Sequence, residues 1–185
     1  MELKANIESL FIYPIKSLGY VELKSVIVNN SGLQLDREWM LTDLNGNFIT
    51  QREFPILNLI QVKSISENGI SLIYNNKETS FTWLSQFESA IKTKIWDSYC
   101  LGTKESNEIS DYFSEILGTN VLLVRMVKDS RIKSNQMMPY KTKLNFVDGY
   151  PIHVINKESV TDLSNKIGYK VQPLQFRPNI IIADL

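Results

Sequence analysis

Four short stretches of this 185-residue sequence place hydrogen-bond donors or positive charges beside a proline, a glycine or an acidic residue. Arginine can grip a phosphate with two N–H groups, lysine adds a compact charge, and serine with backbone N–H groups can complete an anion-binding nest. Asparagine offers both a donor and an acceptor, which suits the edge of a heterocycle. The four stretches are Lys16-Ser17, Asp36-Arg37, Asp148-Gly149-Tyr150-Pro151 and Arg177-Pro178-Asn179. Each is a weak signal alone, because a surface lysine is usually solvated and a surface Asp-Arg pair contributes little.

The composition argues against several other kinds of site. Twenty basic and twenty acidic residues leave no net charge, so a general attraction to nucleic acid or to an acidic membrane is not expected. One cysteine, Cys100, and one histidine, His153, are too few for a structural zinc site or for a disulfide within the chain. No signal peptide and no run of membrane-spanning length is visible, so a reducing cytoplasm is the expected location.

Three kinds of residue are expected to be structural. His153 lies in the strand-like run 150–156 without a nucleophile-elbow motif, which disfavours a Ser-His-Asp hydrolase and favours a satisfied histidine on a strand. Cys100 is expected to be a small buried thiol. The three tryptophans, Trp39, Trp83 and Trp96, could line a pocket, and Trp39 could flank a ligand near Arg37, but ordinary core packing is favoured.

The first eighty residues are typical of short strands separated by turns. Segments 7–15 and 21–30 are rich in β-branched and aromatic residues, and segment 54–66 predicts a strand entered through Pro55. Several short strands at regular spacing indicate a small barrel or sandwich.

Two segments predict β-hairpins. In segment 37–51 the pair Asn45-Gly46 favours a tight turn in which both central residues accept positive φ. Segment 69–83 repeats the pattern, with Asn75-Asn76 as the expected turn.

Two helices are expected in the second half of the chain. Segment 106–118 begins at a capping Ser106 and ends at Gly118, with an apolar stripe of Ile109, Tyr112, Phe113 and Ile116. Segment 156–168 begins at a capping Asn156 and ends at Gly168, with Val160, Leu163 and Ile167 on one face. The fold class is therefore α+β, mainly β, with two helices.

The remaining segments predict a strand, a loop and a terminal strand. Segment 120–127 is typical of a buried strand, whereas 128–148 lacks any period and is expected to be a long loop, a feature often functional in compact domains. The run Ile180-Ile181-Ile182 predicts a strand that needs partners on both sides, so the chain is interpreted as part of something longer; the alternative is a C-terminal strand that completes a sheet.

Four blocks of the sequence resemble MOSC proteins that carry an N-terminal β-barrel domain. They are "IYPIKS", "GLQLDREWMLTDLNGNFITQREFPILNLI", "VDGYPIHVINKESVTDLSNKIG" and "FRPNIII". This family includes bacterial oxidoreductases of the YcbX type and the mitochondrial amidoxime-reducing component. The resemblance runs from about residue 7 to the last residue, in family order, and is loose across 64–106. It implies a small N-terminal β-barrel domain over 1–95 and an incomplete start of a MOSC β-barrel over 96–185.

The resemblance also implies a binding site for the molybdenum cofactor, a pyranopterin (molybdopterin) with a phosphate and a dithiolene. The positions that match the family's cofactor contacts, or the loop that approaches the cofactor, are Lys16, Ser17, Arg37, Gly149, Tyr150, Arg177 and Asn179. Leu18 and Gly19 replace a Cys and a basic residue common in the family, which weakens one expected phosphate contact. The family's metal-ligating cysteine lies downstream of "FRPN", and Cys100 does not match it, so no metal ligand or catalytic residue is assigned here.

The activity that this implies is reduction of a small N-oxygenated substrate with electrons from a flavin or iron–sulfur partner. The chain alone is expected to be inactive without the missing cysteine. The alternatives are a MOSC-type sulfur-carrier or pyridoxal-phosphate-linked protein, a non-catalytic binding module, and a purely structural role. An enzyme requires Lys16, Arg37, Arg177 and Asn179 to converge on one cleft, a binding module predicts an exposed apolar patch, and a structural role predicts that the four stretches lie far apart.

Overall fold

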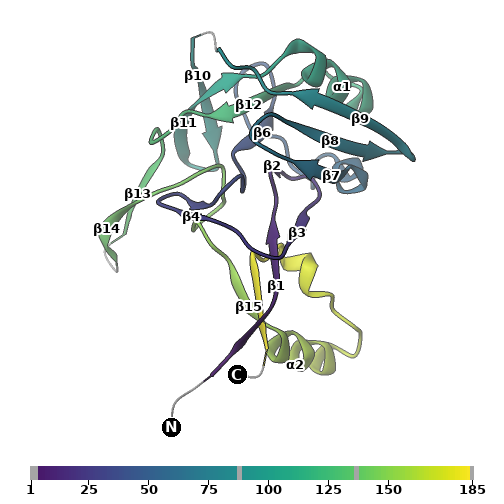
Figure 1. Cartoon of the computed structure of the whole chain (residues 1–185), viewed down its shortest axis with the longest axis vertical. Helices are drawn as coiled ribbons and strands as arrows, with labels where there is room; N and C mark the ends of the chain where they lie inside the picture. The colour runs from purple at the N-terminus through teal and green to yellow at the C-terminus, as the bar shows by residue number, and fades with distance from the viewer. Residues whose placement is uncertain (1–3, 87–88, 136–137, 184–185) are drawn as a thin grey trace.

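The protein is mainly β with two α-helices, which confirms the expected fold class; the computed structural model describes residues 4–86, 89–135 and 138–183 (Figure 1). The strands are β1 (Asn6–Ile12), β2 (Ile15–Lys16), β3 (Val21–Leu23), β4 (Val28–Asn29), β5 (Gly32–Leu33), β6 (Trp39–Thr42), β7 (Gln61–Ile65), β8 (Gly69–Tyr74), β9 (Lys77–Thr82), β10 (Ile91–Ile95), β11 (Ser98–Lys104), β12 (Leu122–Met126), β13 (Ile132–Asn135), β14 (Met138–Lys143), β15 (Val154–Asn156) and β16 (Ile180–Ala183). The helices are α1 (Asn107–Leu117) and α2 (Lys157–Ile167), with short 3₁₀ helices η1 (Pro55–Leu59) and η2 (Pro173–Phe176).

Two sheets organise the molecule, and the start of the chain belongs to both. One sheet has the strand order β10-β11-β12-β6-β2, and the other has the order β15-β16-β1-β3. Tyr13 and Pro14 connect β1 to β2 and so carry the chain from one sheet to the other. Figure 1 shows β1, β15, β16 and α2 gathered at one end of the molecule, where both chain termini also lie.

The main core lies between the five-stranded sheet, the three-stranded sheet β7-β8-β9 and α1. Trp39 of β6 is fully buried and stacks on Trp83, with ring centroids 4.3 Å apart. Its indole Nε1 donates to the buried carboxylate of Glu105 over 2.9 Å. Trp39 is therefore a core residue, as favoured from the sequence, and it lines neither of the two cavities described below.

The hairpin predicted at Asn75-Asn76 is confirmed. Strands β8 and β9 pair antiparallel up to Tyr74 and Lys77, and both central residues have positive φ, 49° and 61°. The other predicted hairpin is only partly right. The chain does reverse at Asn45-Gly46, but only Gly46 has positive φ (83°). The returning arm makes two isolated bridges, from Phe48 to Thr42 and from Asn47 to Lys94, instead of a full strand. Asp43 holds this turn by accepting backbone N–H groups, which a two-residue turn does not require.

Two other expectations about strands and loops were wrong. The segment 54–66 begins with η1 before becoming β7, because Pro55 at the first helical position fixes φ and donates no N–H group. The expected loop 128–148 contains the antiparallel pair β13 and β14, although residues 136–137 lie outside the described part. The non-local backbone bond from Leu144 N–H to the Arg131 carbonyl helps to hold this pair, and sequence periodicity cannot report such a bond.

Both predicted helices are present, with corrections at their ends and faces. Each ends at a glycine in the left-handed conformation, Gly118 (φ 65°) and Gly168 (φ 77°). Asn156 caps α2 by accepting from the Glu158 N–H, whereas the Ser106 side chain makes no capping bond to α1. The apolar face expected on α2 is buried only at Val160, since Leu163 and Ile167 remain exposed.

The last strand has a partner on each side, as its apolar sequence predicted. Strand β16 pairs antiparallel with β1 and parallel with β15. The domain boundary expected at residue 95 stays a prediction, and the five-stranded sheet joins strands from both sides of it. Among the described residues, no helix combines the length and apolar character needed to cross a membrane.

Candidate functional site

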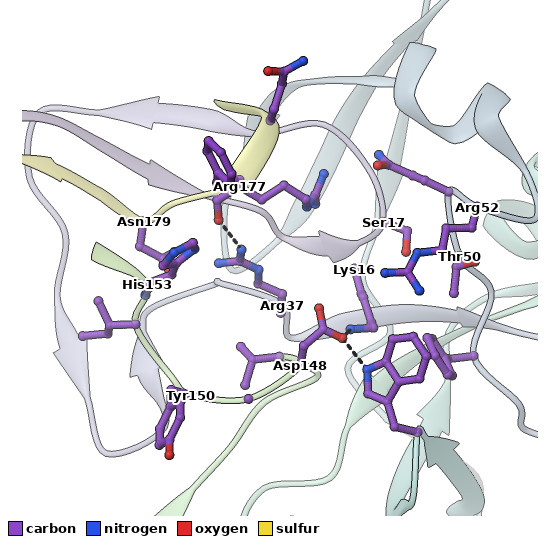
Figure 2. A pocket seen from close by; sticks show the side chains of 18 residues that line it. Lys16, Ser17, Arg37, Thr50, Arg52, Asp148, Tyr150, His153, Arg177 and Asn179 are labelled. Carbon is purple, nitrogen blue, oxygen red and sulfur yellow. Dashed lines mark hydrogen bonds and ion pairs between the residues drawn. The ribbon is translucent and has the colours of Figure 1, made fainter. Parts of the chain in front are cut away.

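All four donor stretches singled out in the sequence line one cavity of about 560 Å³. The four stretches reach it from the end of β2, the turn before β6, the loop before β15 and the loop between η2 and β16, and residues 48–52 and the turn between β10 and β11 complete the lining. The predicted site residues that line it are Lys16, Ser17, Arg37, Gly149, Tyr150, Arg177 and Asn179. Figure 2 shows these side chains arriving from different segments around a shared space. The arrangement is the convergence expected of an enzyme and argues against a purely structural role.

Three of these residues hold an unusual backbone conformation. Ser17, Arg37 and Arg177 have φ values of 72°, 48° and 52°, in the left-handed region that non-glycine residues rarely adopt. Such conformations cost of the order of 1 kcal/mol or more each, and they cluster where function requires a side chain to be aimed in one direction. Each turn is tied by backbone bonds, for example from Arg37 N–H to the Tyr13 carbonyl.

At one side of the cavity, Lys16 is paired with Asp148. Its Nζ donates to Asp148 Oδ1 over 2.7 Å, and the same oxygen accepts from Trp96 Nε1 over 2.8 Å. Burial lowers the pKa of Lys16, and the nearby Asp148 charge opposes that shift. Burial would raise the pKa of Asp148, but the Lys16 charge and the two hydrogen bonds outweigh it, so this pKa lies below its ordinary value.

At the other side, two arginines lie over the ring of Tyr13. The guanidinium carbons of Arg37 and Arg177 are 4.3 Å and 4.2 Å from its centroid. Arg37 donates to the buried carboxylate of Asp36 over 2.6 Å and to the Arg177 carbonyl over 2.9 Å; Figure 2 marks the second bond. Burial raises the pKa of Asp36, against the opposing Arg37 charge, and raises the pKa of Tyr13 to about 12. The charge of Arg37 is thus balanced inside the protein.

The charge of Arg177 is not balanced in this way. No carboxylate within the described residues forms an ion pair with it, and its buried Nη2 lacks a hydrogen-bond partner there. Burial and then the neighbouring Arg37 charge lower its pKa to about 10, so the guanidinium is still charged at neutral pH. Leaving a buried N–H group without an acceptor is costly, so an anion that bonds to Arg177 would be stabilised at this side of the cavity.

Asn179 lines the cavity, but its side chain ties backbone segments together. Its Nδ2 donates to the Phe11 carbonyl and its Oδ1 accepts from the His153 N–H, each over 3.1 Å. The residue is 1% exposed. These bonds fix β1 against the loop before β15, so the described contacts of Asn179 position the walls of the cavity.

The other predicted residues differ in how firmly they are held. The Ser17 hydroxyl donates to the Ile49 carbonyl over 3.1 Å. Gly149 has open space where a Cβ would be, so close packing does not require glycine there. Tyr150 is half-exposed, with Lys133 Nζ 4.5 Å from its ring centroid and bonded to the Gly149 carbonyl.

Sequence reasoning missed several residues that complete the cavity. Thr50, Gln51 and Arg52 line it, as do Phe48, Trp96 and His153. His153 immediately precedes β15 and is exposed, not enclosed in a strand as expected. A signal for the first three was present, because "TQREFP" also sets polar donors before a proline after the Asn45-Gly46 turn.

Within the described residues, no group of three or more His, Cys, Asp or Glu side chains is placed to hold a metal ion. Cys100 is buried beside Thr93, as expected of a small buried thiol, and burial raises the pKa of this thiol. The cavity instead suits an anion. Its described lining includes the cations Lys16, Arg37, Arg52 and Arg177 and a single carboxylate, that of Asp148.

Comparison with known proteins gives matches over nearly the whole chain. A model of the MOSC N-terminal beta barrel domain matches residues 4–120. Molybdenum cofactor sulfurase of Oryza sativa subsp. japonica is 26% identical, covering 96% of this chain and 24% of that protein. Mitochondrial amidoxime reducing component 2 of Rattus norvegicus is 27% identical, covering 96% of this chain and 56% of that protein. A solution structure of a protein from Bordetella bronchiseptica overlaps 63% of this chain and 99% of that one at a TM-score of 0.43 and 10% identity, too distant to support an argument.

Proposed function

This chain belongs to the family of the MOSC N-terminal beta barrel domain, and we propose that its cationic cavity binds the phosphate and pterin of a molybdenum cofactor. The observation that carries the proposal is Arg177, a half-buried residue whose buried Nη2 has no hydrogen-bond partner in the described structure and which lies among three further cations. A phosphate oxygen would supply the acceptor that Arg177 lacks.

The residues present fit such a ligand. Lys16, Arg52 and Arg177 would provide charge for the phosphate. The Ser17 and Thr50 hydroxyls also line the cavity, and each would donate to the phosphate only by leaving its present acceptor, the Ile49 carbonyl or the Glu53 carboxylate. Trp96 and Phe48, whose ring centroids lie 4.9 Å apart, would cover the pterin face and exclude water. When bound, the molybdenum centre would supply the redox chemistry, while this chain orients the cofactor and balances its charge.

The wider activity is also a proposal, because the chain spans 24% and 56% of the two relatives described above. We propose that the protein containing this region reduces a small N-oxygenated substrate with electrons from a flavin or iron–sulfur partner. The similarity to a mitochondrial amidoxime reducing component supports this reaction. A second candidate is a sulfurase-type role in which the cofactor itself is the substrate, supported by the similarity to molybdenum cofactor sulfurases.

Cofactor binding can be tested by fluorescence, because the tryptophans differ in position. Trp96 lies at the cavity and is 45% exposed, whereas Trp39 and Trp83 are buried. Anaerobic titration with molybdopterin should quench the emission of Trp96, and Trp96→Phe should remove most of the signal while calorimetry still detects binding.

Variants then decide whether the cavity is the site. Arg177→Ala should weaken molybdopterin binding by about tenfold or more, which corresponds to about 1.4 kcal/mol. Arg52→Ala, at the rim, serves as a second variant that does not disturb the buried network around Tyr13. Lys143→Ala, which alters an exposed pair with Asp129, is the control and should bind like the wild type. Absence of binding, or equal binding by all three variants, would refute the proposal.

A further inference from the structure

A second cavity, of about 840 Å³, adjoins the first and differs from it in chemistry. It lies between the loop before β3, η1, the start of β7 and the segment around η2. The two cavities share Gln51, Gln175 and Arg177, so a ligand in the second would lie next to whatever fills the first. Its described lining includes the carboxamides of Gln51, Asn58, Gln61, Gln172 and Gln175.

The second cavity is rich in carboxamides and nearly free of charge. Five of its described lining residues are amides, Arg177 is its one cation, and none is acidic. Each carboxamide presents a donor and an acceptor side by side. A ligand that matches these carboxamides carries adjacent hydrogen-bond donors and acceptors of its own and has no net charge. An anion would meet only one cation here, and it would leave the amide N–H donors and carbonyl acceptors poorly paired.

Part of this wall is already ordered. Gln172 and Gln175 hold each other in a capping box at the start of η2, in which the Gln172 N–H donates to Gln175 Oε1 over 3.0 Å. Elsewhere in the lining, Gly19 packs closely on the junction of η1 and β7, because a Cβ there would meet the Ile60 carbonyl oxygen at 2.9 Å. A wall held in this way loses little conformational entropy when a ligand binds.

Two buried donors at the junction of the cavities have no acceptor in the described structure. They are the hydroxyl of Tyr13, a residue 1% exposed, and Nη2 of Arg177. Both residues line the second cavity, and the guanidinium carbon lies 4.2 Å from the Tyr13 ring centroid. Because the anion proposed for the first cavity would satisfy Arg177, a ligand carbonyl in the second cavity would supply the acceptor that the Tyr13 hydroxyl lacks.

Tyr20 adds an aromatic surface at the open side. Its ring is 41% exposed and makes edge contacts with Phe11 and Tyr13, at centroid distances of 5.2 Å and 6.1 Å. These contacts support one side of the ring and leave part of it accessible to a planar partner.

We propose that this amide-lined cavity binds an uncharged planar ring compound with an amide-type edge, a ring carbonyl beside a ring N–H. The carbonyl would accept from the Tyr13 hydroxyl, the ring would lie against Tyr20, and the carboxamides would pair with the remaining edge. This site is separate from the proposed cofactor site and does not depend on it.

The test uses uracil as the neutral probe and benzoate as a planar anion of similar size, followed by two-dimensional amide NMR of the whole chain. Uracil should give saturable shifts at residues around Tyr20, Gln61 and Gln172, unchanged by inorganic phosphate in the first cavity. Gln61→Leu and Tyr20→Ala should each lower the affinity for uracil by roughly two- to tenfold, which is the range for the loss of one polar or aromatic contact. Gln34→Leu, which alters an exposed amide paired with Glu67, is the control and should have no effect.

Three results would overturn the proposal. The first is the absence of saturable chemical-shift changes with uracil up to its solubility limit. The second is uracil binding that neither Gln61→Leu nor Tyr20→Ala weakens. The third is tighter binding of benzoate than of uracil at the same residues. Displacement of uracil by inorganic phosphate would place the probe in the first cavity and would equally refute a separate site. Failure of the proposed cofactor site would appear only as loss of molybdopterin binding and would leave the uracil result intact.

Discussion

Lys16 and Asp148 stand 132 positions apart in the chain, yet Lys16 Nζ lies 2.7 Å from Asp148 Oδ1. The pair is asymmetric, because the Lys16 side chain is 7% exposed and that of Asp148 is 70% exposed. The lysine is fixed in the wall of the first cavity, whereas the carboxylate reaches it from an exposed loop. An incoming anion and Asp148 therefore compete for the same cation.

The first prediction concerns this competition. Asp148→Asn removes the competing charge and should strengthen binding of inorganic phosphate by up to roughly tenfold, or about 1.4 kcal/mol. The gain should shrink at high salt, because screening weakens the interaction of charges near the surface. Calorimetry at low and high ionic strength measures both effects.

Asp129→Asn is the matched control, since it removes a carboxylate from the exposed pair with Lys143. Phosphate affinity should stay at the wild-type value in this variant. Unchanged or weaker binding by Asp148→Asn would show that this carboxylate assists the anion site instead of competing with it.

The second prediction separates backbone strain from charge at Arg177. Arg177→Ala and Arg177→Gly both remove the guanidinium, but only glycine adopts φ near 52° without steric cost. The glycine variant should therefore be more stable than the alanine variant by about 1 kcal/mol. Urea denaturation of the two variants measures the difference, and equal free energies of unfolding would mean that the turn is not strained.

The third prediction compares two tryptophans. Trp39→Phe removes the stack on Trp83 and the donor to the buried carboxylate of Glu105, and should cost about 2–4 kcal/mol of unfolding free energy. Trp96→Phe alters a half-exposed ring and its bond to Asp148, and should cost less than about 1 kcal/mol. Chemical denaturation measures both, and similar costs would contradict the assignment of Trp39 to the core and Trp96 to the cavity.

The fourth prediction concerns acid stability at the turn held by Asp43. Burial would slightly raise its pKa, but hydrogen bonds from Asn47 and from the backbone of residues 45–47 outweigh that effect and lower it below 3.8. A lowered native pKa means that the ionised carboxylate stabilises the fold above pH 3.8 and that this contribution is lost as pH falls through the native pKa.

Asp43→Asn should therefore be less stable than the wild type at pH 7, by a few tenths of a kcal/mol to about 1 kcal/mol, with the difference narrowing below pH 3.8. Denaturation curves collected across this range measure the change. Asp162→Asn, in an exposed pair with Lys166 on α2, should cost only about 0.2–0.5 kcal/mol. A destabilisation by Asp43→Asn that is constant down to pH 2 would contradict the argument.

Local sequence signals predicted the elements well wherever nearby residues decide the conformation. Asn75-Asn76, Gly118 and Gly168 lie where the backbone needs positive φ, and those turns and helix ends are found where they were expected. Where distant pairing decides, the predictions failed: β13 and β14 form in an expected loop, and the returning arm after Gly46 is not a full strand.

The same distinction between local and distant interactions applies to the candidate site. The sequence by itself determined which short stretches carry donors at constrained turns, because proline, glycine and charged residues act within a few positions of one another. Only the tertiary structure decided that Lys16, Arg37 and Arg177 share one cavity, because that depends on β16 pairing with β1 and on β6 pairing with β2. The tertiary structure also decided that the Asn179 side chain ties the cavity walls together. It decided as well that Trp39 packs in the core while Trp96 faces the cavity, because the burial of a side chain is set by neighbours that are remote in the chain.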